Sequence, residues 1–275
     1  YEVFCPFMPG YHPDDKELSS YDPTTISLEI IKFINSFIRR FSDYIALNSD
    51  LYLSHKPDLH IKLNKIENWD NLYRFWVKNS PRNDKGDLVR LYFLLNQIEY
   101  IKINEIAGSI AEVGVYKGTT AKLFHYFFPD KEILLFDTFE GFDQRDINHK
   151  KESSKENLAS KTVFNSSLES VQDFVGKSAS VKLIPGYFPE TTRGIDPENQ
   201  YALVHLDADL YSPQFSGLEY FYPRMTPGGV IIIHDCNNEF TGSKRALNEF
   251  FLNKPETPII IPDKSGSAIV VKLKS

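Results

Sequence analysis

Acidic and histidine side chains follow two apolar runs in the second half of the sequence. The run YALVHL leads to Asp207 and Asp209, and the run GGVIII leads to His234 and Asp235. Carboxylate oxygens suit a divalent cation, whereas an imidazole nitrogen suits a transition metal better than magnesium. If these runs are neighbouring strands, Asp207, His234 and Asp235 form a metal site, with Asp207 and His234 as candidate proton acceptors. The alternatives are a structural role for His234 and, as we favour, a helix cap at Asp209.

Two earlier motifs suit a ligand that carries an anionic group and a ribose. In AEVGVYKGTT, Gly114 and Gly118 allow a tight turn before a helix whose free amides can hold an anion. In LLFDTFEGF, Asp137 ends an apolar run about 20 residues later, where an acidic residue binds ribose hydroxyls in Rossmann sheets. The alternatives are a simple turn at the glycines, a helix or turn cap at Asp137 and a core position for Phe139.

Short apolar runs alternate with helical segments from residue 87 onward. The pattern predicts seven strands, over residues 110–115, 132–137, 181–185, 201–207, 230–234, 259–261 and 268–272. It predicts helices over residues 119–128, 168–175, 214–222 and 243–252. This alternation is typical of an α/β fold with a Rossmann-like, doubly wound and mostly parallel sheet, which binds ligands at the carboxyl ends of its strands. The polar stretch 138–167 is too long for an ordinary connection and predicts a solvated loop, a lid or a substrate loop.

The segment before residue 87 has a different character. Residues 1–25 contain four prolines and a glycine among scattered aromatics, which predicts an irregular arm. From Ile26 to Leu47, apolar residues recur at helical spacing and predict an amphipathic helix. A further helix begins after Asp87, a favoured capping residue, and extends through Ile101. We therefore divide the chain into an N-terminal arm with a helical extension, residues 1–86, and a ligand-binding domain, residues 87–275.

Composition excludes several classes of protein. A net charge of -6 gives no general attraction to nucleic acid, and a hydrophobic fraction of 41% in 275 residues is that of a globular chain. Two cysteines exclude a disulfide framework. No apolar run approaches the roughly 20 residues that span a membrane. Because the residues after Tyr1 lack a basic segment followed by an apolar stretch, we expect a secretion signal to be absent or already removed. The expected location is the cytoplasm.

Six motifs in sequence resemble the macrocin O-methyltransferase family. They are AEVGVYKGTTA, FDTFEGF, IPGYFPETT, VHLDADLYSP, YPRMTPGGVIIIHDCNN and KRALNEF. The family consists of class I methyltransferases that use S-adenosylmethionine to modify sugar hydroxyls of natural products, so residues 87–275 resemble a domain of that class. The resemblance implies contact with S-adenosylmethionine by Glu112, Gly114, Gly118, Thr119, Asp137, Thr138, Phe139, Gly186, Tyr187, Phe188 and Asp207. It also implies magnesium ligands at Asp207 and Asp235. Many members have two consecutive aspartates where this chain has His234 and Asp235, which leaves the metal preference open.

The expected reaction is methylation of a small-molecule hydroxyl, with a carbohydrate or a glycosylated metabolite as the acceptor. Besides Asp207 and His234, His205 is a candidate proton acceptor. The resemblance implies that the N-terminal helices either join two subunits in a homodimer or cover the site. The rival interpretation is a metal-dependent glycosyltransferase, because Asp207, Ala208 and Asp209 form a DxD motif. A domain that binds S-adenosylmethionine without catalysis is the second alternative, because a fold does not fix a function.

Overall fold

In the computed structural model of the protein, the described residues are 69–79, 87–152, 164–236 and 241–273, with single helical positions between residues 30 and 48. The chain divides into two compact units, Tyr1–Lys62 and Leu63–Ser275. The described positions between 30 and 48 are all helical, as the amphipathic pattern predicts. The predicted irregular arm, residues 1–25, lies outside the described residues. Our division of the chain after residue 86 stays a prediction.

The second unit is built on a seven-stranded sheet in the order β3-β2-β1-β4-β5-β7-β6. The strands are β1 Ser109–Val113, β2 Ile133–Asp137, β3 Val181–Pro185, β4 Tyr201–Leu206, β5 Met225–Ile233, β6 Ile259–Ile261 and β7 Ser267–Val271. The first five strands pair in parallel, and β7 lies antiparallel between β5 and β6. The Rossmann-like, mostly parallel, seven-stranded sheet predicted from the sequence is therefore confirmed.

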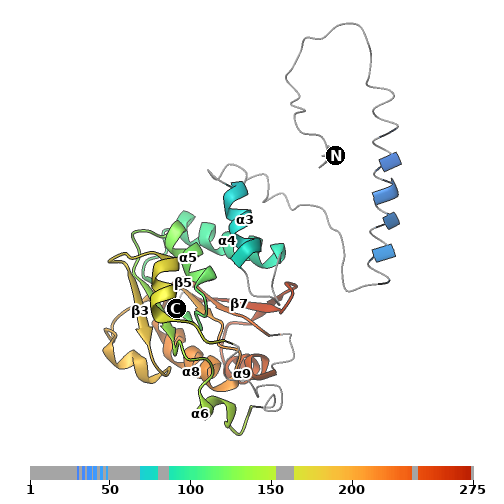
Figure 1. Ribbon diagram of the computed structural model, residues 1–275. Coiled ribbons are helices and arrows are strands. Elements are labelled where there is room, and N and C mark those ends of the chain that lie inside the picture. The colour runs from blue at the N-terminus through green and yellow to red at the C-terminus, as the bar shows by residue number, and fades with distance from the viewer. Residues whose placement is uncertain are drawn as a thin grey trace. The chain divides into compact units, whose positions relative to one another are not determined.

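Helices cover both faces of this sheet (Figure 1). They are α3 Trp69–Asn79, α4 Leu88–Ile103, α5 Thr119–Phe127, α6 Gln144–Ile147, α7 Leu168–Val175, α8 Tyr211–Phe221 and α9 Thr241–Phe251. In Figure 1, α3, α4 and α5 lie on one side of the sheet, and α8 and α9 lie together on the other. The sequence predicted neither α3 nor the short α6.

Burial explains why the central strands read as continuous apolar runs. Every residue of β1 and of β4 is buried, as expected for strands that are covered by helices on both faces. The strand β5 begins at Met225 rather than at Val230, because the pairing with β4 includes a register shift after Tyr201 that accommodates the Pro-Gly-Gly segment. Across the described part of the chain, no helix combines the length and the apolar character that a membrane span requires.

The strand order places a switch point between β1 and β4. From β1 the chain winds outward to β2 and β3, and from β4 it winds outward in the opposite direction to β5. The loops that leave the carboxyl ends of β1 and β4 therefore separate and leave a crevice, which is where open parallel sheets bind ligands. Candidate functional residues should lie at this edge.

Candidate functional site

The loop that follows β1 crosses directly over the end of β4. Gly114 has φ +84°, and a side chain there would clash with the backbone carbonyl of Asp207. Glycine is therefore required, because only a residue without a Cβ combines this conformation with so close a backbone approach. The contact fixes the position of Asp207 relative to the glycine loop.

The carboxylate of Asp137 closes the same loop. Its Oδ2 accepts hydrogen bonds from the backbone N–H groups of Val115, at 2.7 Å, and Tyr116, at 2.9 Å, and its Oδ1 accepts one from Phe139 N–H at 2.7 Å. The structure thus gives Asp137 the turn-capping role that was one of two readings of the sequence. A carboxylate has about four lone-pair positions, so a ribose hydroxyl can still bind to it.

A pocket opens at the carboxyl ends of β1, β2 and β4. Seven of the residues expected to contact the cofactor line it: Gly114, Asp137, Thr138, Gly186, Tyr187, Phe188 and Asp207. They come from four separate loops, which the parallel sheet brings to one edge. The Tyr187 hydroxyl donates to Asp146 of α6 at 2.8 Å, which anchors this part of the wall.

The ends of the long polar loop also line the pocket. Phe142 enters the loop and Phe164 leaves it, and their rings meet at a centroid distance of 4.9 Å. Phe164 also meets the Tyr116 ring edge-on at 5.6 Å. The loop is thus attached to the pocket at both ends, while residues 153–163 lie outside the described residues.

The other four predicted cofactor residues do not line this pocket. Glu112 is paired with His205 inside the sheet, Thr119 donates to the carbonyl of Asn79 at 2.9 Å, and Phe139 is 7% exposed. Gly118 faces α7, where a Cβ would come within 2.7 Å of Val175, so its absence of a side chain serves helix packing. Any role of these four residues toward a cofactor remains a prediction.

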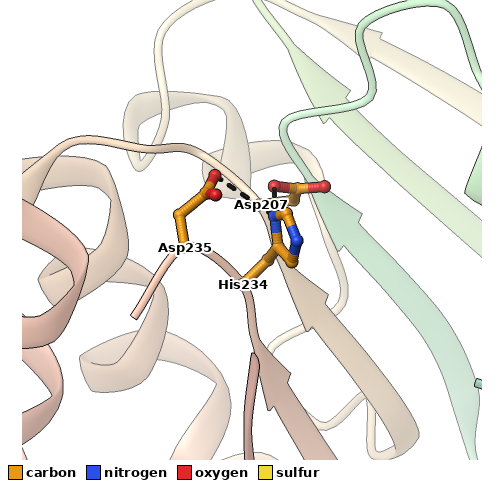
Figure 2. A group of neighbouring side chains, drawn as sticks. All are labelled: Asp207, His234 and Asp235. Atoms are coloured by element: carbon orange, nitrogen blue, oxygen red, sulfur yellow. Dashed lines mark hydrogen bonds and ion pairs between the residues drawn. The ribbon is translucent and has the colours of Figure 1, made fainter. Parts of the chain in front are cut away.

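Asp207, His234 and Asp235 come together as the sequence predicted (Figure 2). The Nδ1 atom of His234 lies 2.8 Å from Oδ1 of Asp207 and 3.2 Å from Oδ2 of Asp235. One donor atom from each residue fits within a 4.8 Å span. Two carboxylates and an imidazole form a donor set that fits a divalent cation, and the imidazole favours a transition metal over magnesium.

These contacts shift the pKa values of the groups in the cluster. Burial disfavours the charged form of His234, but the carboxylates of Asp207 and Asp235 outweigh it and raise the pKa of His234 well above its ordinary value. Burial would raise the pKa of Asp207, but His234 and Arg90 hold that pKa well below the ordinary value. Both carboxylates favour a proton at Nδ1 of His234, which can then donate to Asp207 and Asp235.

Our expectation that Asp209 caps the next helix is wrong. The capping position of α8 is Leu210, which makes no side-chain capping hydrogen bond. Asp209 has φ +59°, lines the pocket and shares a hydrogen bond with Asp235. Burial, followed by the charge of Asp235, raises the pKa of Asp209 well above its ordinary value. Asp209 therefore joins Asp207 in the loop after β4 as a carboxyl group that lines the pocket, which a capping rule alone could not reveal.

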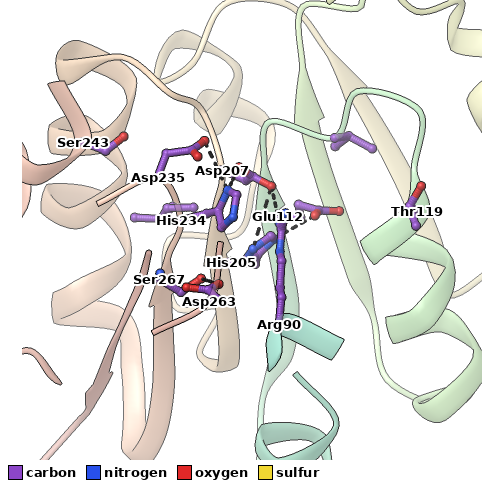
Figure 3. Close-up of polar contacts among 12 residues, drawn as sticks. Arg90, Glu112, Thr119, His205, Asp207, His234, Asp235, Ser243, Asp263 and Ser267 are labelled. Carbon is purple, nitrogen blue, oxygen red and sulfur yellow. Dashed lines mark hydrogen bonds and ion pairs between the residues drawn. The ribbon is translucent and has the colours of Figure 1, made fainter. Parts of the chain in front are cut away.

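Arg90 is a site residue that our sequence analysis missed. Its Nη2 atom donates to Oδ2 of Asp207 at 2.7 Å, and its side chain is 3% exposed (Figure 3). The sequence held a signal, since Arg90 precedes Leu94 by four positions and so lies on the apolar face of its helix. A charged residue on a buried face requires a partner of opposite charge.

Comparisons with known proteins agree with this geometry. A family model described as Macrocin-O-methyltransferase (TylF) matches residues 44–267. The chain is 26% identical, over 158 residues, to the 8-demethyl-8-(2,3-dimethoxy-alpha-L-rhamnosyl)-tetracenomycin-C 4'-O-methyltransferase of Streptomyces olivaceus, a match that covers 54% of this chain and 60% of that relative. It is 27% identical, over 158 residues, to the Mycinamicin III 3''-O-methyltransferase of Micromonospora griseorubida, which covers 53% and 62%. The chain thus spans less than two thirds of either relative.

The solved structure of the O-methyltransferase NovP has the same fold as this chain, with a TM-score of 0.60 at 21% sequence identity. The structural match covers 68% of this chain and 81% of the NovP chain.

Proposed function

Because the chain belongs to the macrocin O-methyltransferase family, we propose that it transfers the methyl group of S-adenosylmethionine to a hydroxyl group of a small molecule. The observation that carries the proposal is the position of the pocket. It opens at the switch point of the sheet and has the glycine loop and Asp137 on one side and the acidic cluster on the other. A cofactor and an acceptor can therefore meet there.

We place the cofactor along the loops that follow β1, β2 and β3. Asp137 lines the pocket, and its one remaining lone-pair position would accept a ribose hydroxyl. Gly186, Tyr187 and Phe188 would lie beside the adenine, in agreement with their position in the pocket wall. The sulfonium of S-adenosylmethionine supplies the reactivity, so the protein must align the acceptor oxygen and remove its proton.

Two carboxyl groups face the pocket where an acceptor would lie, Asp207 and Asp209. We propose that one of them takes the proton of the acceptor hydroxyl. His234 donates to Asp207 and Asp235 and so fixes the orientation of both. Asp207, His234 and Asp235 would hold a divalent cation, after His234 has lost the proton that it now donates. When bound, such a cation would lower the pKa of the acceptor hydroxyl.

The acceptor class that we propose is a carbohydrate, free or attached to a larger metabolite. The name of the Streptomyces olivaceus relative supports it, since that name includes a rhamnosyl group. The comparisons give no support to the glycosyltransferase reading of the DxD motif. A domain that only binds the cofactor is separated from an enzyme by the experiment below.

The test is calorimetric titration of S-adenosylmethionine, with and without Mg²⁺, into the wild type and Asp137→Ala. We expect micromolar binding by the wild type and a loss of roughly tenfold or more in Asp137→Ala, because hydrogen bonds to a charged group contribute about 1.5–3 kcal/mol. Asp173→Ala, on the exposed side of α7, is the matched control, and circular dichroism checks that each variant folds. An absence of binding under every metal condition would overturn the proposal.

Turnover needs a second measurement. The wild type, S-adenosylmethionine and a panel of deoxysugar glycosides are incubated together, and S-adenosylhomocysteine is measured as the product. Binding of the cofactor without turnover on any acceptor of the panel would favour the non-catalytic alternative.

A further inference from the structure

An arginine from outside the predicted motifs reaches the acidic cluster. Arg90 lies in the first turn of α4, 117 positions before Asp207, and its guanidinium donates to that carboxylate at 2.7 Å. Figure 3 shows the side chain approaching Asp207 from the side opposite to His234 and Asp235. A buried guanidinium remains charged, because arginine does not lose its proton in proteins.

The backbone that carries Arg90 is held firmly. Asp87 caps α4 by accepting the Arg90 N–H at 3.0 Å, and its other carboxylate oxygen accepts the N–H of Lys264 at 2.6 Å. The carbonyl of Asp87 accepts the indole N–H of Trp76 at 2.9 Å. The first turn of α4 is thereby fixed to α3 and to the turn between β6 and β7. The position of the Arg90 guanidinium therefore depends on tertiary contacts that fix the backbone from which its side chain extends.

Arg90 and His234 each contact a different carboxylate oxygen of Asp207. Oδ2 is held by Arg90, and Oδ1 is held by His234. Only Oδ1 therefore points toward the group formed with Asp235. A divalent cation held by Asp207, His234 and Asp235 would lie near the fixed positive charge of Arg90, because Arg90 contacts one of these three ligands directly.

We propose that Arg90 is a positioning residue of the acidic cluster, which orients Asp207 through Oδ2 and limits the affinity of the cluster for divalent cations. The physical reason is electrostatic. A fixed guanidinium on the same carboxylate repels a divalent ion, and in a buried site such repulsion exceeds its value in water. The inference rests on the proposed function only in treating this cluster as the acceptor end of the site.

The test measures binding of Mn²⁺ alone to the full chain, by the loss of the free-ion signal in electron paramagnetic resonance. Arg90→Gln keeps a hydrogen-bond donor without the charge, and we expect it to bind Mn²⁺ about tenfold or more tightly than the wild type. Arg90→Lys keeps the charge, and we expect its dissociation constant to stay within about threefold of the wild type. Arg245→Gln, which removes an exposed guanidinium from Glu249, is the matched control.

Equal or weaker Mn²⁺ binding by Arg90→Gln would overturn the proposal, as would an absence of binding by both the wild type and Arg90→Gln. Arg90→Met, which fills the same space without donors, takes the place of Arg90→Gln if circular dichroism shows that the latter is unfolded. S-adenosylmethionine binding is measured separately on the same samples. A wild type that fails to bind the cofactor contradicts the proposed function, while the Mn²⁺ comparison still decides the role of Arg90.

Discussion

Beside the acidic cluster, Glu112 of β1 and His205 of β4 form a buried pair with Nδ1 and Oε1 2.8 Å apart. Burial raises the pKa of Glu112 well above 4.5 and lowers the pKa of His205 from 6.5 to about 3. The folded pair therefore keeps a proton to a higher pH than the same groups do in the unfolded chain. The unfolded chain binds two protons at these groups below pH 4.5, one between 4.5 and 6.5, and none above 6.5.

This proton count predicts how Glu112→Gln changes the pH dependence of stability. Once the pH passes 6.5, and until Glu112 loses its proton in the folded state, the folded wild type holds one proton more than the unfolded chain, so its free energy of unfolding falls as the pH rises. Glu112→Gln lacks this proton, so its stability relative to the wild type should rise with pH over that range, by up to about 1.4 kcal/mol per pH unit. Urea unfolding at several pH values measures the difference, with the exposed Glu169→Gln as the control. Parallel curves for the wild type and Glu112→Gln would contradict the assignment.

Asp209 allows a second prediction at the scale of single residues. It lines the pocket and shares a hydrogen bond with Asp235, so it can take the proton of an acceptor hydroxyl only after it has lost the proton of that hydrogen bond. Asp209→Asn keeps the shape of the side chain and removes the carboxyl group. We expect kcat to fall by roughly a hundredfold, as when a general base is lost, and the dissociation constant of S-adenosylmethionine to stay within about threefold. The control is Asp143→Asn at the pocket wall. Unchanged kcat in Asp209→Asn would exclude Asp209 and leave Asp207 as the proton acceptor.

At the scale of elements, a buried serine and glutamine join α8 and α9 to the ends of the strands. The Ser243 hydroxyl donates to the carbonyl of Asp209 at 2.9 Å and accepts from the Gln214 amide at 3.1 Å. The same amide donates to the carbonyl of Leu206 at 3.3 Å. The positive φ of Asp209 is therefore maintained by two helices packed against each other.

Ser243→Ala should destabilise the fold and impair the site together. The substitution removes one buried hydrogen bond to the carbonyl of Asp209 and one from the amide of Gln214. This loss should lower the free energy of unfolding by about 1–3 kcal/mol. Urea unfolding measures this loss, and Ser170→Ala on the exposed side of α7 provides the comparison. A Ser243→Ala variant as stable as Ser170→Ala would show that the hydroxyl does not fix the loop.

At the scale of the whole molecule, all the described residues that line the pocket belong to the second compact unit. We therefore expect a chain of residues 63–275 to fold and to bind S-adenosylmethionine within about threefold of the full chain, because it keeps all of this described lining. Circular dichroism and calorimetry measure the two properties. A truncated chain that folds but loses the cofactor would show that residues 1–62 contribute to the site.

The sequence alone determined the sheet and the edge at which the site lies. Apolar runs the length of strands, separated by helical segments, are a local property of the chain, and four strands were predicted to end in polar residues. Because the strands are parallel, their carboxyl ends lie at one edge of the sheet, regardless of the length or conformation of the connecting loops. The meeting of Asp207, His234 and Asp235 follows from this rule alone.

Only the tertiary structure decided what each of these side chains contacts. Arg90 reaches Asp207 across 117 positions, and no local pattern encodes a contact at that separation. The same holds for Glu112, which the family resemblance assigned to the cofactor and which the structure pairs with His205. Asp209 follows a capping preference in the sequence, but the packing of α8 and α9 turns it toward the pocket. Spacing along the chain fixes which edge a residue reaches, whereas burial and charge pairing fix its partner.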